Sequence, residues 1–175
     1  MATFSKEVFR GIWSACPTPF TSSMELDIES IDRMVEHHVR LGIKGLFVAG
    51  SCGEGPCITD TQKRRLVTRI RETARDRLII SAQVTDNSPA RIRDNSAMIA
   101  DCGADIAVIA PPLFCQLPTP GNVLAHYLES IEMSVLPVGI YDLGARRPFS
   151  PTSNQMAVIC GHEKVVLVKD SSAED

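Results

Sequence analysis

The sequence has 175 residues, of which 44% are hydrophobic and 22% charged, and its 18 basic and 21 acidic residues give a net charge of −3. These values are typical of a globular domain, and the absence of a basic run argues against nucleic acid or a membrane surface as a partner. No apolar run reaches the ~20 residues of a membrane-spanning helix. The first residues lack the apolar core of ~7–15 residues that a signal peptide needs. We therefore expect a cytoplasmic protein.

Six cysteines are spread along the chain without a CxxC pair, at positions 16, 52, 57, 102, 115 and 160. This spacing is not typical of a disulfide framework or of a metal site. We expect most of these cysteines to be small buried hydrophobic side chains, and we predict no metal and no other cofactor.

Six short apolar segments predict β-strands, because they are rich in β-branched residues and bounded by Gly, Pro or charge. Their nearly continuous apolar character is typical of parallel strands that are covered on both faces. The segments are 12–16, 45–50, 78–84, 105–110, 137–142 and 165–169.

Segments with helical periodicity or capping residues alternate with the strands. Asp60 is predicted as an N-cap, Ser88-Pro89 as another helix start, and Gly103 as a helix end. The helices are expected at 28–41, 60–75, 88–102, 119–133 and 151–160.

The strand-helix pair recurs about every 30 residues, which is the size of a βα unit. Neither GxGxxG after the first strand nor a P-loop is present, so the pattern favours a barrel over an open nucleotide-binding sheet. We expect an α/β fold, a (β/α)8 TIM barrel of which this chain supplies about the first six βα units.

Residues 1–175 would then form a single barrel domain that lacks its C-terminal strands and helices, because such barrels have eight strands and ~250 residues. An open barrel would expose two apolar strand edges. We therefore expect the chain to be part of a larger functional unit, either truncated or split. The alternative is an open six-stranded sheet that is complete as it stands.

Functional residues of a parallel barrel gather at the carboxyl ends of its strands. Lys169 follows four apolar residues there, where a low dielectric favours the neutral amine, and a neutral amine can form a Schiff base with a ketone. Tyr141 ends another apolar strand and could transfer a proton. The alternatives are a lysine that reaches into solvent and a tyrosine packed between strand and helix.

Two further groups could bind a carboxylate. The loop GSCGEG, residues 50–55, offers backbone N–H groups from Gly50 onward, and Ser51 or Cys52 could add a side-chain donor. Arg146 could bind a carboxylate through two parallel hydrogen bonds. The alternatives are an ordinary βα turn and a surface arginine beside Arg147.

Four segments in order, GIWSACPTPF, GSCGEG, YDLGAR and VVLVKDSS, resemble the dihydrodipicolinate synthase / N-acetylneuraminate lyase family of class I aldolases. The resemblance covers nearly the whole chain. It implies a (β/α)8 barrel, commonly a homotetramer, that forms a Schiff base between pyruvate or another 2-oxo acid and a lysine on strand six. We therefore expect a homo-oligomer, either a tetramer or a dimer.

The resemblance also implies residue roles. Lys169 would be the Schiff-base lysine and Tyr141 the proton relay. The backbone of Ser51 and Cys52, in the loop that begins at Gly50, would hold the pyruvate carboxylate, and the Ser51 hydroxyl would lie beside the tyrosine. Arg146 matches the arginine that meets the second substrate's carboxylate in the synthases.

The sequence departs from the family pattern at several positions. Cys52 stands where the family has a second threonine, and a thiol is the weaker hydrogen-bond donor. Leu113 and Phe114 replace an aromatic pair and so remove the phenol that a synthase shares between subunits. Asp142 replaces the usual asparagine, and Gly144 stands where proline is common.

These departures favour a lyase or aldolase that makes or breaks a C–C bond between pyruvate and an aldehyde, with a 2-keto-3-deoxy sugar acid as the type of substrate. One alternative is a 4-hydroxy-tetrahydrodipicolinate synthase with an altered proton relay. Another is a dehydratase or hydratase-aldolase of the same family. A third, from a different class, is a non-catalytic fragment or a 2-oxo-acid binding protein.

Overall fold

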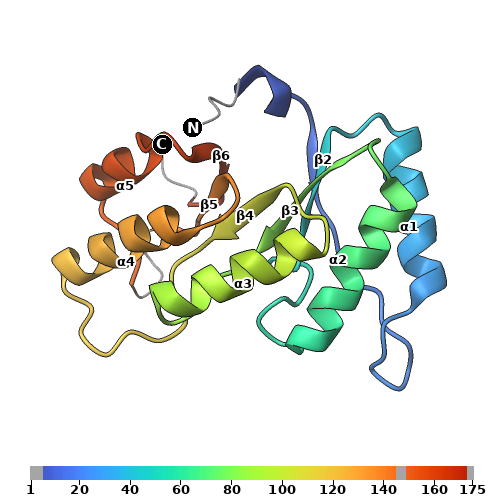
Figure 1. Cartoon of the computed structure of the whole chain (residues 1–175), viewed down its shortest axis with the longest axis horizontal. Helices are drawn as coiled ribbons and strands as arrows, with labels where there is room; N and C mark the ends of the chain where they lie inside the picture. The colour runs from blue at the N-terminus through green and yellow to red at the C-terminus, as the bar shows by residue number, and fades with distance from the viewer. Residues whose placement is uncertain (1–5, 145–148, 173–175) are drawn as a thin grey trace. The chain divides into compact units, whose positions relative to one another are not determined.

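The computed structural model describes residues 6–144 and 149–172 (Figure 1). They form two compact units, each built from parallel strands and alternating helices. The first unit extends to Gln83 and includes Met98–Asp105, and the second includes Val84–Ala97 and continues from Ile106. The six predicted strands and the five predicted helices are all present, with ends that differ by a few residues.

In the first unit, three strands lie in chain order and pair in parallel, with Trp13 opposite Gly45 and Gly45 opposite Ile79. Gly45 allows this close pairing, because a Cβ there would lie 2.4 Å from the Trp13 ring. The elements wholly in this unit are η1 (Lys6–Phe9), β1 (Trp13–Ala15), α1 (Ile28–Arg40), β2 (Gly45–Val48), α2 (Asp60–Ala74) and β3 (Ile79–Gln83).

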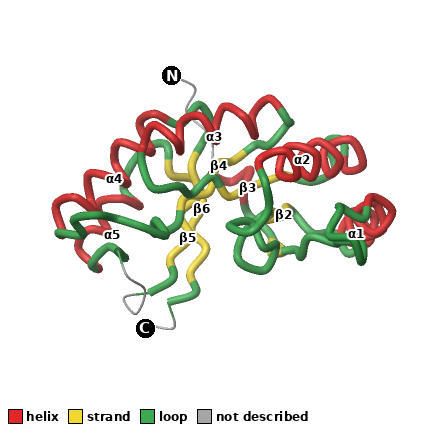
Figure 2. Tube along the Cα trace, turned by 90° about the horizontal axis from the view of Figure 1, so that it is seen from below, coloured by secondary structure: helices red, strands yellow, loops and turns green. Residues whose placement is uncertain are grey.

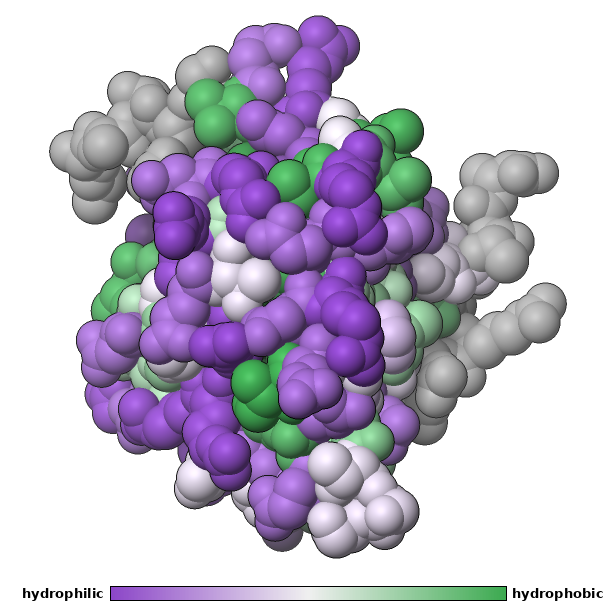
Figure 3. All heavy atoms as spheres, turned by 90° about the vertical axis from the view of Figure 1, so that its right-hand side faces the viewer, coloured by the Kyte–Doolittle hydropathy of each residue, from purple (hydrophilic) through white to green (hydrophobic). Residues whose placement is uncertain are grey.

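Helices α1 and α2 lie side by side in Figure 1. Their apolar stripes are buried, including Ile31 and Val35 of α1 and Leu66 and Ile70 of α2. Figure 3 shows the face of the molecule that carries these helices, and that face is mostly hydrophilic. Each helix therefore presents an apolar side to the core and a polar side to solvent.

The predicted N-cap of α2 is wrong by one residue. Thr59 is the cap: its hydroxyl accepts a hydrogen bond from the Gln62 amide at 3.1 Å, and the Gln62 side chain accepts one from the Thr59 amide at 3.0 Å. This reciprocal capping box satisfies two amides at the helix start. Asp60 instead lies in the first turn, where its negative charge interacts favourably with the positive end of the helix dipole.

Helix α3 (Pro89–Asp101) begins and ends as predicted. The Ser88 hydroxyl accepts a hydrogen bond from the Arg91 amide at 3.4 Å, and Pro89 is the first helical residue. Gly103 follows the helix with φ +91°, a conformation that a residue with a side chain rarely adopts.

In the second unit, three parallel strands again follow chain order. Figure 2 shows β5 and β6 side by side, with Tyr141 opposite Lys169 and Asp142 opposite Asp170 in register. The elements wholly in this unit are β4 (Ile106–Ile109), α4 (Pro120–Met133), β5 (Val138–Asp142), α5 (Ser153–Cys160) and β6 (Val165–Asp170).

The expected burial on both faces is wrong for two strands. All four residues of β2 and of β4 are buried, but β1 is half-buried throughout. In β6 only Val165 is buried among the apolar residues, and Val168 is 46% exposed. Within residues 6–144 and 149–172, β1 pairs with β2 alone and β6 with β5 alone, so both are edge strands.

The expectation that most cysteines are buried is also wrong. Cys16 is buried, whereas Cys52 and Cys57 are exposed because they lie in the loop between β2 and α2. The other three, at positions 102, 115 and 160, are half-buried. None of the helices described here has the length and apolar character needed to cross a membrane.

Candidate functional site

The predicted site residues fall into two groups, each within one unit. Tyr141 and Lys169 belong to β5 and β6 of the second unit. Gly50, Ser51 and Cys52 lie in the loop between β2 and α2 of the first unit. The predicted carboxylate-binding Arg146 lies outside the described residues.

The structure brings Tyr141 and Lys169 together. The Lys169 Nζ atom lies 3.6 Å from the centroid of the Tyr141 ring. Tyr141 is only 5% exposed and Lys169 is half-buried. Because the two strands are parallel and the residues are in register, both side chains project from the same face near the carboxyl ends of their strands. An amine and a phenol are thus neighbours at the predicted end of the strands.

Ser171 is a contact of Lys169 that the sequence did not identify. Its hydroxyl lies 3.5 Å from the Lys169 Nζ atom, and its amide donates to the Asp142 carbonyl at 2.9 Å. The Asp142 carboxylate in turn accepts a hydrogen bond from the Gly144 amide at 2.8 Å. These bonds join the loops that follow β5 and β6, immediately after the tyrosine and the lysine.

The loop after β2 is closed by its own backbone. The Gly50 carbonyl accepts hydrogen bonds from the amides of Gly53 and Gly55, both at 3.1 Å. Glu54 donates to the Ser51 carbonyl at 3.3 Å, and Cys57 donates to the Glu54 carbonyl at 2.8 Å. The Cys52 amide donates to no protein group within the described ranges. An amide without a protein acceptor is suited to an anionic ligand.

The loop also contains strained and crowded backbone. Ala49 and Glu54 both adopt φ +53°, which is uncommon for residues with a side chain. A Cβ at Gly55 would lie 1.6 Å from the Ala49 carbonyl oxygen. Such strain persists where the surrounding structure over-determines the backbone, and it is often found at functional sites.

Thr18 is a second residue whose contribution the sequence did not reveal. It follows β1, is 6% exposed, and donates from its hydroxyl to the Gly53 carbonyl at 2.6 Å. Thr18 therefore connects the loop to the segment after the first strand. The threonine stands between two prolines, but no sequence pattern indicates which carbonyl it contacts.

Cys16, close to Thr18 in the sequence, is a structural thiol. It donates to the Phe47 carbonyl at 3.6 Å, and burial raises its pKa to about 12. Cys16 is therefore protonated at neutral pH.

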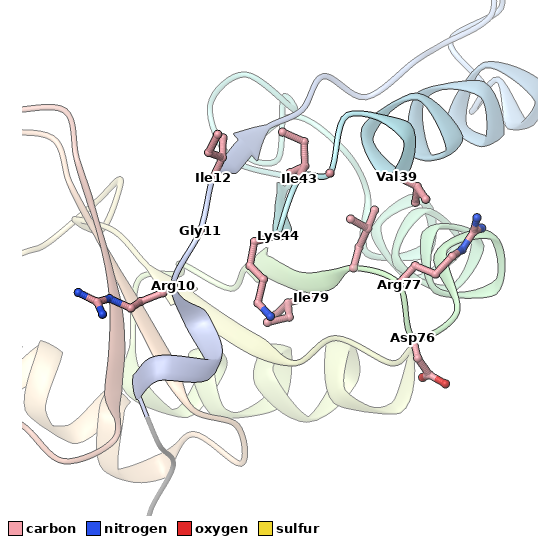
Figure 4. A pocket seen from close by; sticks show the side chains of 11 residues that line it. Arg10, Gly11, Ile12, Val39, Ile43, Lys44, Asp76, Arg77 and Ile79 are labelled. Atoms are coloured by element: carbon pink, nitrogen blue, oxygen red, sulfur yellow. The ribbon is translucent and has the colours of Figure 1, made fainter.

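A hollow of about 400 Å³ lies at the opposite ends of the first unit's strands (Figure 4). Residues that precede β1, β2 and β3 line it, among them Ile12, Lys44 and Leu78. Arg77 also lines it, but its guanidinium is engaged with the Glu36 carboxylate. None of the predicted site residues that the structure describes contributes to this hollow. Function in parallel barrels resides at the other ends of the strands, so we do not place the site here.

No group of three or more His, Cys, Asp or Glu side chains, among the residues that are described, is arranged to hold a metal ion. The predicted residues of the second unit supply an amine and a phenol, and those of the first unit supply a hydroxyl and backbone N–H groups.

Successive parallel βα units, with Tyr141 and Lys169 at the carboxyl ends of β5 and β6, define a βα-barrel protein. The chain belongs to the dihydrodipicolinate synthetase family, whose model matches residues 8–174. The described residues of the four segments that suggested this family lie in or directly after β1, β2, β5 and β6.

Relatives with two different names are similar to this chain. The 4-hydroxy-tetrahydrodipicolinate synthase 1 of Streptomyces coelicolor is 31% identical over 156 residues, which cover 89% of this chain and 51% of the relative. The N-acetylneuraminate lyase of Rhizobium meliloti is 29% identical over 164 residues, covering 94% of this chain and 54% of the relative. The chain thus spans about half the length of these curated relatives.

A solved structure confirms the fold. The dihydrodipicolinate synthase from Acinetobacter baumannii, complexed with pyruvate, matches with a TM-score of 0.85 at 23% identity, covering 93% of this chain and 55% of that one. The chain therefore has the fold expected from its sequence, a (β/α)8 barrel of which it supplies about the first six βα units.

Proposed function

We propose that the chain carries the Schiff-base site of a class I aldolase or lyase, which makes or breaks a C–C bond between pyruvate and an aldehyde. The observation that carries this proposal is the position of the Lys169 Nζ atom, 3.6 Å from the centre of the Tyr141 ring. It supplies a nucleophilic amine beside a phenol, at the strand ends where barrels of this family bind substrate. Membership of the family supports the same chemistry.

The reaction begins at Lys169. The unprotonated amine adds to the ketone carbon of a 2-oxo acid, the former carbonyl oxygen leaves as water after proton transfer, and a protonated imine remains. The Ser171 hydroxyl, 3.5 Å from Nζ, is placed to hydrogen-bond the amine before it reacts. The positive imine nitrogen then serves as the electron acceptor for the next step, so that the chemistry uses only protein groups.

Cleavage follows by movement of one electron pair. Tyr141 accepts the proton from the C4 hydroxyl of the substrate, the C3–C4 bond breaks, and its electrons move to the imine nitrogen. An aldehyde departs and an enamine remains. Protonation of the enamine at C3 and addition of water then release pyruvate and regenerate the amine. Synthesis is the reverse of these steps.

The substrate carboxylate would bind the loop after β2. Its ligands would be the backbone N–H groups of Ser51 and Cys52, in the turn that starts at Gly50, with the Ser51 hydroxyl as a further donor. The Cys52 amide, which donates to no protein group in the described part of the chain, supports this assignment. Arg146 would bind a carboxylate of the second substrate when that substrate has one.

A synthase is the second candidate, favoured by the name of the Streptomyces coelicolor relative. It would use the same lysine to condense pyruvate with an aldehyde or imine partner. The loop after β4 weighs against it, because Leu113 and Phe114, which are 74% and 62% exposed, carry no phenol hydroxyl. A dehydratase or hydratase-aldolase would share the Schiff base, and these activities are separated by assaying the products.

A non-catalytic 2-oxo-acid binding protein is the candidate from another class. It would hold pyruvate without turnover, and product formation separates it from an enzyme. We further propose that the protein is cytoplasmic and assembles as a homo-oligomer, a dimer or a tetramer, which a native mass measurement tests.

Reductive trapping tests the proposal directly. The protein is incubated with pyruvate and borohydride, its intact mass is recorded, and the modified peptide is sequenced. We expect one reduced pyruvate adduct, located on Lys169.

Two lysine variants make this test specific. Lys169→Arg keeps the positive charge but cannot form an imine, so it should give no adduct. Lys164→Arg is the matched control, because the Lys164 ammonium bonds the Glu132 carbonyl at 2.6 Å, at the end of α4. It should form the adduct as the wild type does. A folded wild-type chain that gives no adduct, or an adduct on another lysine, would overturn the proposal.

A further inference from the structure

The hydrogen bond from Thr18 to Gly53 connects the segment after β1 to the proposed carboxylate loop. The distance from Oγ1 to the carbonyl oxygen is 2.6 Å, short for an O–H···O bond, and Thr18 and Gly53 are both buried. Because the carbonyl is shielded from water, loss of the threonine hydroxyl would leave it without a partner. This bond is thus a specific constraint on the loop.

The constraint reaches the residues proposed to bind substrate. The Gly53 amide bonds the Gly50 carbonyl at 3.1 Å, so Gly50 and Gly53 close a turn with Ser51 and Cys52 at its centre. Gly53 has little room to move, since a Cβ there would lie 3.0 Å from the Ala49 nitrogen and 3.1 Å from the Cys16 carbonyl oxygen. Because Gly53 closes the turn, holding its carbonyl restrains the backbone that carries the amides of Ser51 and Cys52.

We propose that Thr18 is a positioning residue for binding of the substrate carboxylate, and this inference rests on the proposed function. Its hydroxyl holds the turn in the anion-binding orientation before substrate arrives. Thr18 does not touch the substrate in this role but acts through the Gly53 carbonyl. The loop is then preorganised, and the entropic cost of ordering it is not incurred on binding.

The carboxylate keeps the same charge throughout the reaction, so the loop binds the ground state and the transition state about equally. Loss of such uniform binding raises KM and leaves kcat nearly unchanged. General loss of structure would instead reduce the amount of active protein, and so the maximal rate. The separation of KM from kcat therefore distinguishes positioning of the turn from a merely structural role.

The test compares Thr18→Val, which keeps the shape of the side chain without the hydroxyl, with Thr18→Ser, which keeps the hydroxyl. Borohydride trapping on Lys169 is measured over a range of pyruvate concentrations. For Thr18→Val we expect the half-saturating pyruvate concentration to rise about 3- to 10-fold, the effect of one lost hydrogen bond. The rate at saturation should change less than about twofold, and Thr18→Ser should restore the wild-type value. If Thr18→Val does not fold, Thr18→Ala lacks the same hydroxyl and is interpreted in the same way.

Pyruvamide is the matched probe, because it presents the same ketone without a carboxylate charge. Thr18→Val should affect trapping with pyruvamide much less than trapping with pyruvate. If the wild type forms the adduct and Thr18→Val has the wild-type half-saturation, or affects both probes equally, the inference is wrong while the proposed function stands. If the folded wild type forms no adduct with pyruvate, both are overturned.

Discussion

Tyr141 and Lys169 face each other in register on β5 and β6, with the lysine Nζ atom 3.6 Å from the centroid of the tyrosine ring. The ring face attracts the positive ammonium group, and the phenol oxygen at the edge of the ring is a separate chemical group. The same tyrosine can thus do two things. Its ring positions the lysine, and its hydroxyl transfers protons in the proposed reaction.

Substitution of Tyr141 by Phe separates these two contributions. Tyr141→Phe keeps the ring under the ammonium but removes the proton-transfer group. We expect the pyruvate adduct on Lys169 still to form, while C–C bond turnover falls by about 10²- to 10⁴-fold, the usual contribution of a general acid-base group. The two quantities are measured by borohydride trapping and by pyruvate release from a 2-keto-3-deoxy sugar acid.

Tyr141→Leu is the control for the ring. It removes both the aromatic face and the hydroxyl, so it should slow adduct formation as well as turnover. If Tyr141→Phe abolished the adduct on a folded protein, the phenol would be needed for the imine step itself. If its turnover were unchanged, the proposed proton transfer by Tyr141 would be wrong.

At position 55 the neighbouring backbone leaves no room for any residue other than glycine. A Cβ there would lie 1.6 Å from the Ala49 carbonyl oxygen, and Ala49 is already held at φ +53°. Because backbone cannot move aside as a flexible side chain can, Gly55→Ala should destabilise the fold by at least about 4 kcal/mol or prevent folding. Urea denaturation followed by circular dichroism measures this loss.

Gly121→Ala is the matched control. Gly121 lies in α4, and a Cβ there would meet no atom within 4 Å. Alanine is favoured over glycine in helices by up to about 1 kcal/mol, so this variant should be as stable as the wild type or more stable. A Gly55→Ala protein with wild-type stability would show that the loop backbone is more adaptable than its contacts indicate.

Cysteine reactivity reports on the proposed carboxylate loop without a turnover assay. Cys52 and Cys57 are exposed, whereas Cys16 is 2% exposed and burial raises its pKa to about 12. Because the thiolate is the reactive form, iodoacetamide should modify Cys52 and Cys57 in the folded protein and Cys16 only after unfolding. Peptide mapping by mass spectrometry follows each site.

Pyruvate should protect one of these two exposed thiols. If the carboxylate binds the amides of Ser51 and Cys52, pyruvate at ten times its Kd should slow alkylation of Cys52 about tenfold. Cys57, three residues beyond the glutamate of the same loop, serves as the internal control and should react at its original rate. Equal protection of both thiols, or of neither, would contradict binding at the centre of the turn.

The sequence alone predicts the fold because the fold depends on local patterns. Each strand is a short apolar run and each helix has its own periodicity or capping residues, so all of these elements could be located one at a time. Burial could not be predicted in this way, because it depends on which strands lie beside one another. The apolar segment that ends at Val168 is as hydrophobic as β4, yet Val168 is 46% exposed at a sheet edge.

The residues of the candidate site differ in the same way: some can be identified from local sequence patterns, and others only from contacts made on folding. Lys169, Tyr141 and the glycine-rich loop are visible in the sequence because their residue types suggest chemistry at strand ends. The roles of Thr18 and Ser171 are not visible, since each depends on a contact made by folding: Thr18 with Gly53, 35 residues away, and Ser171 with the Asp142 carbonyl. A hydroxyl that is one of many in a sequence becomes informative only when its partner is known.

One ion-pair network in the first unit leads to a prediction about pH. Arg69 of α2 binds the Asp32 carboxylate of α1 through two guanidinium nitrogens, and the Thr73 hydroxyl donates to the same carboxylate at 2.7 Å. The arginine hydrogen bonds, and then the threonine hydrogen bond, lower the pKa of Asp32, although partial burial opposes them. The network therefore joins two neighbouring helices most strongly when the aspartate is ionised.

The sign of the pH effect follows from this shift. An aspartate whose pKa is lower in the folded than in the unfolded chain stabilises the fold above the unfolded value of about 4, and the contribution is lost as pH falls through the lowered pKa. Asp32→Asn should thus have a lower urea midpoint than the wild type at neutral pH, and the difference should shrink below about pH 4. Asp101→Asn is the control, since Asp101 is exposed and forms no ion pair with the other described residues; it should leave the midpoint nearly unchanged. A difference for Asp32→Asn that stayed constant from pH 7 to pH 3 would mean that shape, rather than charge, accounts for the stabilisation.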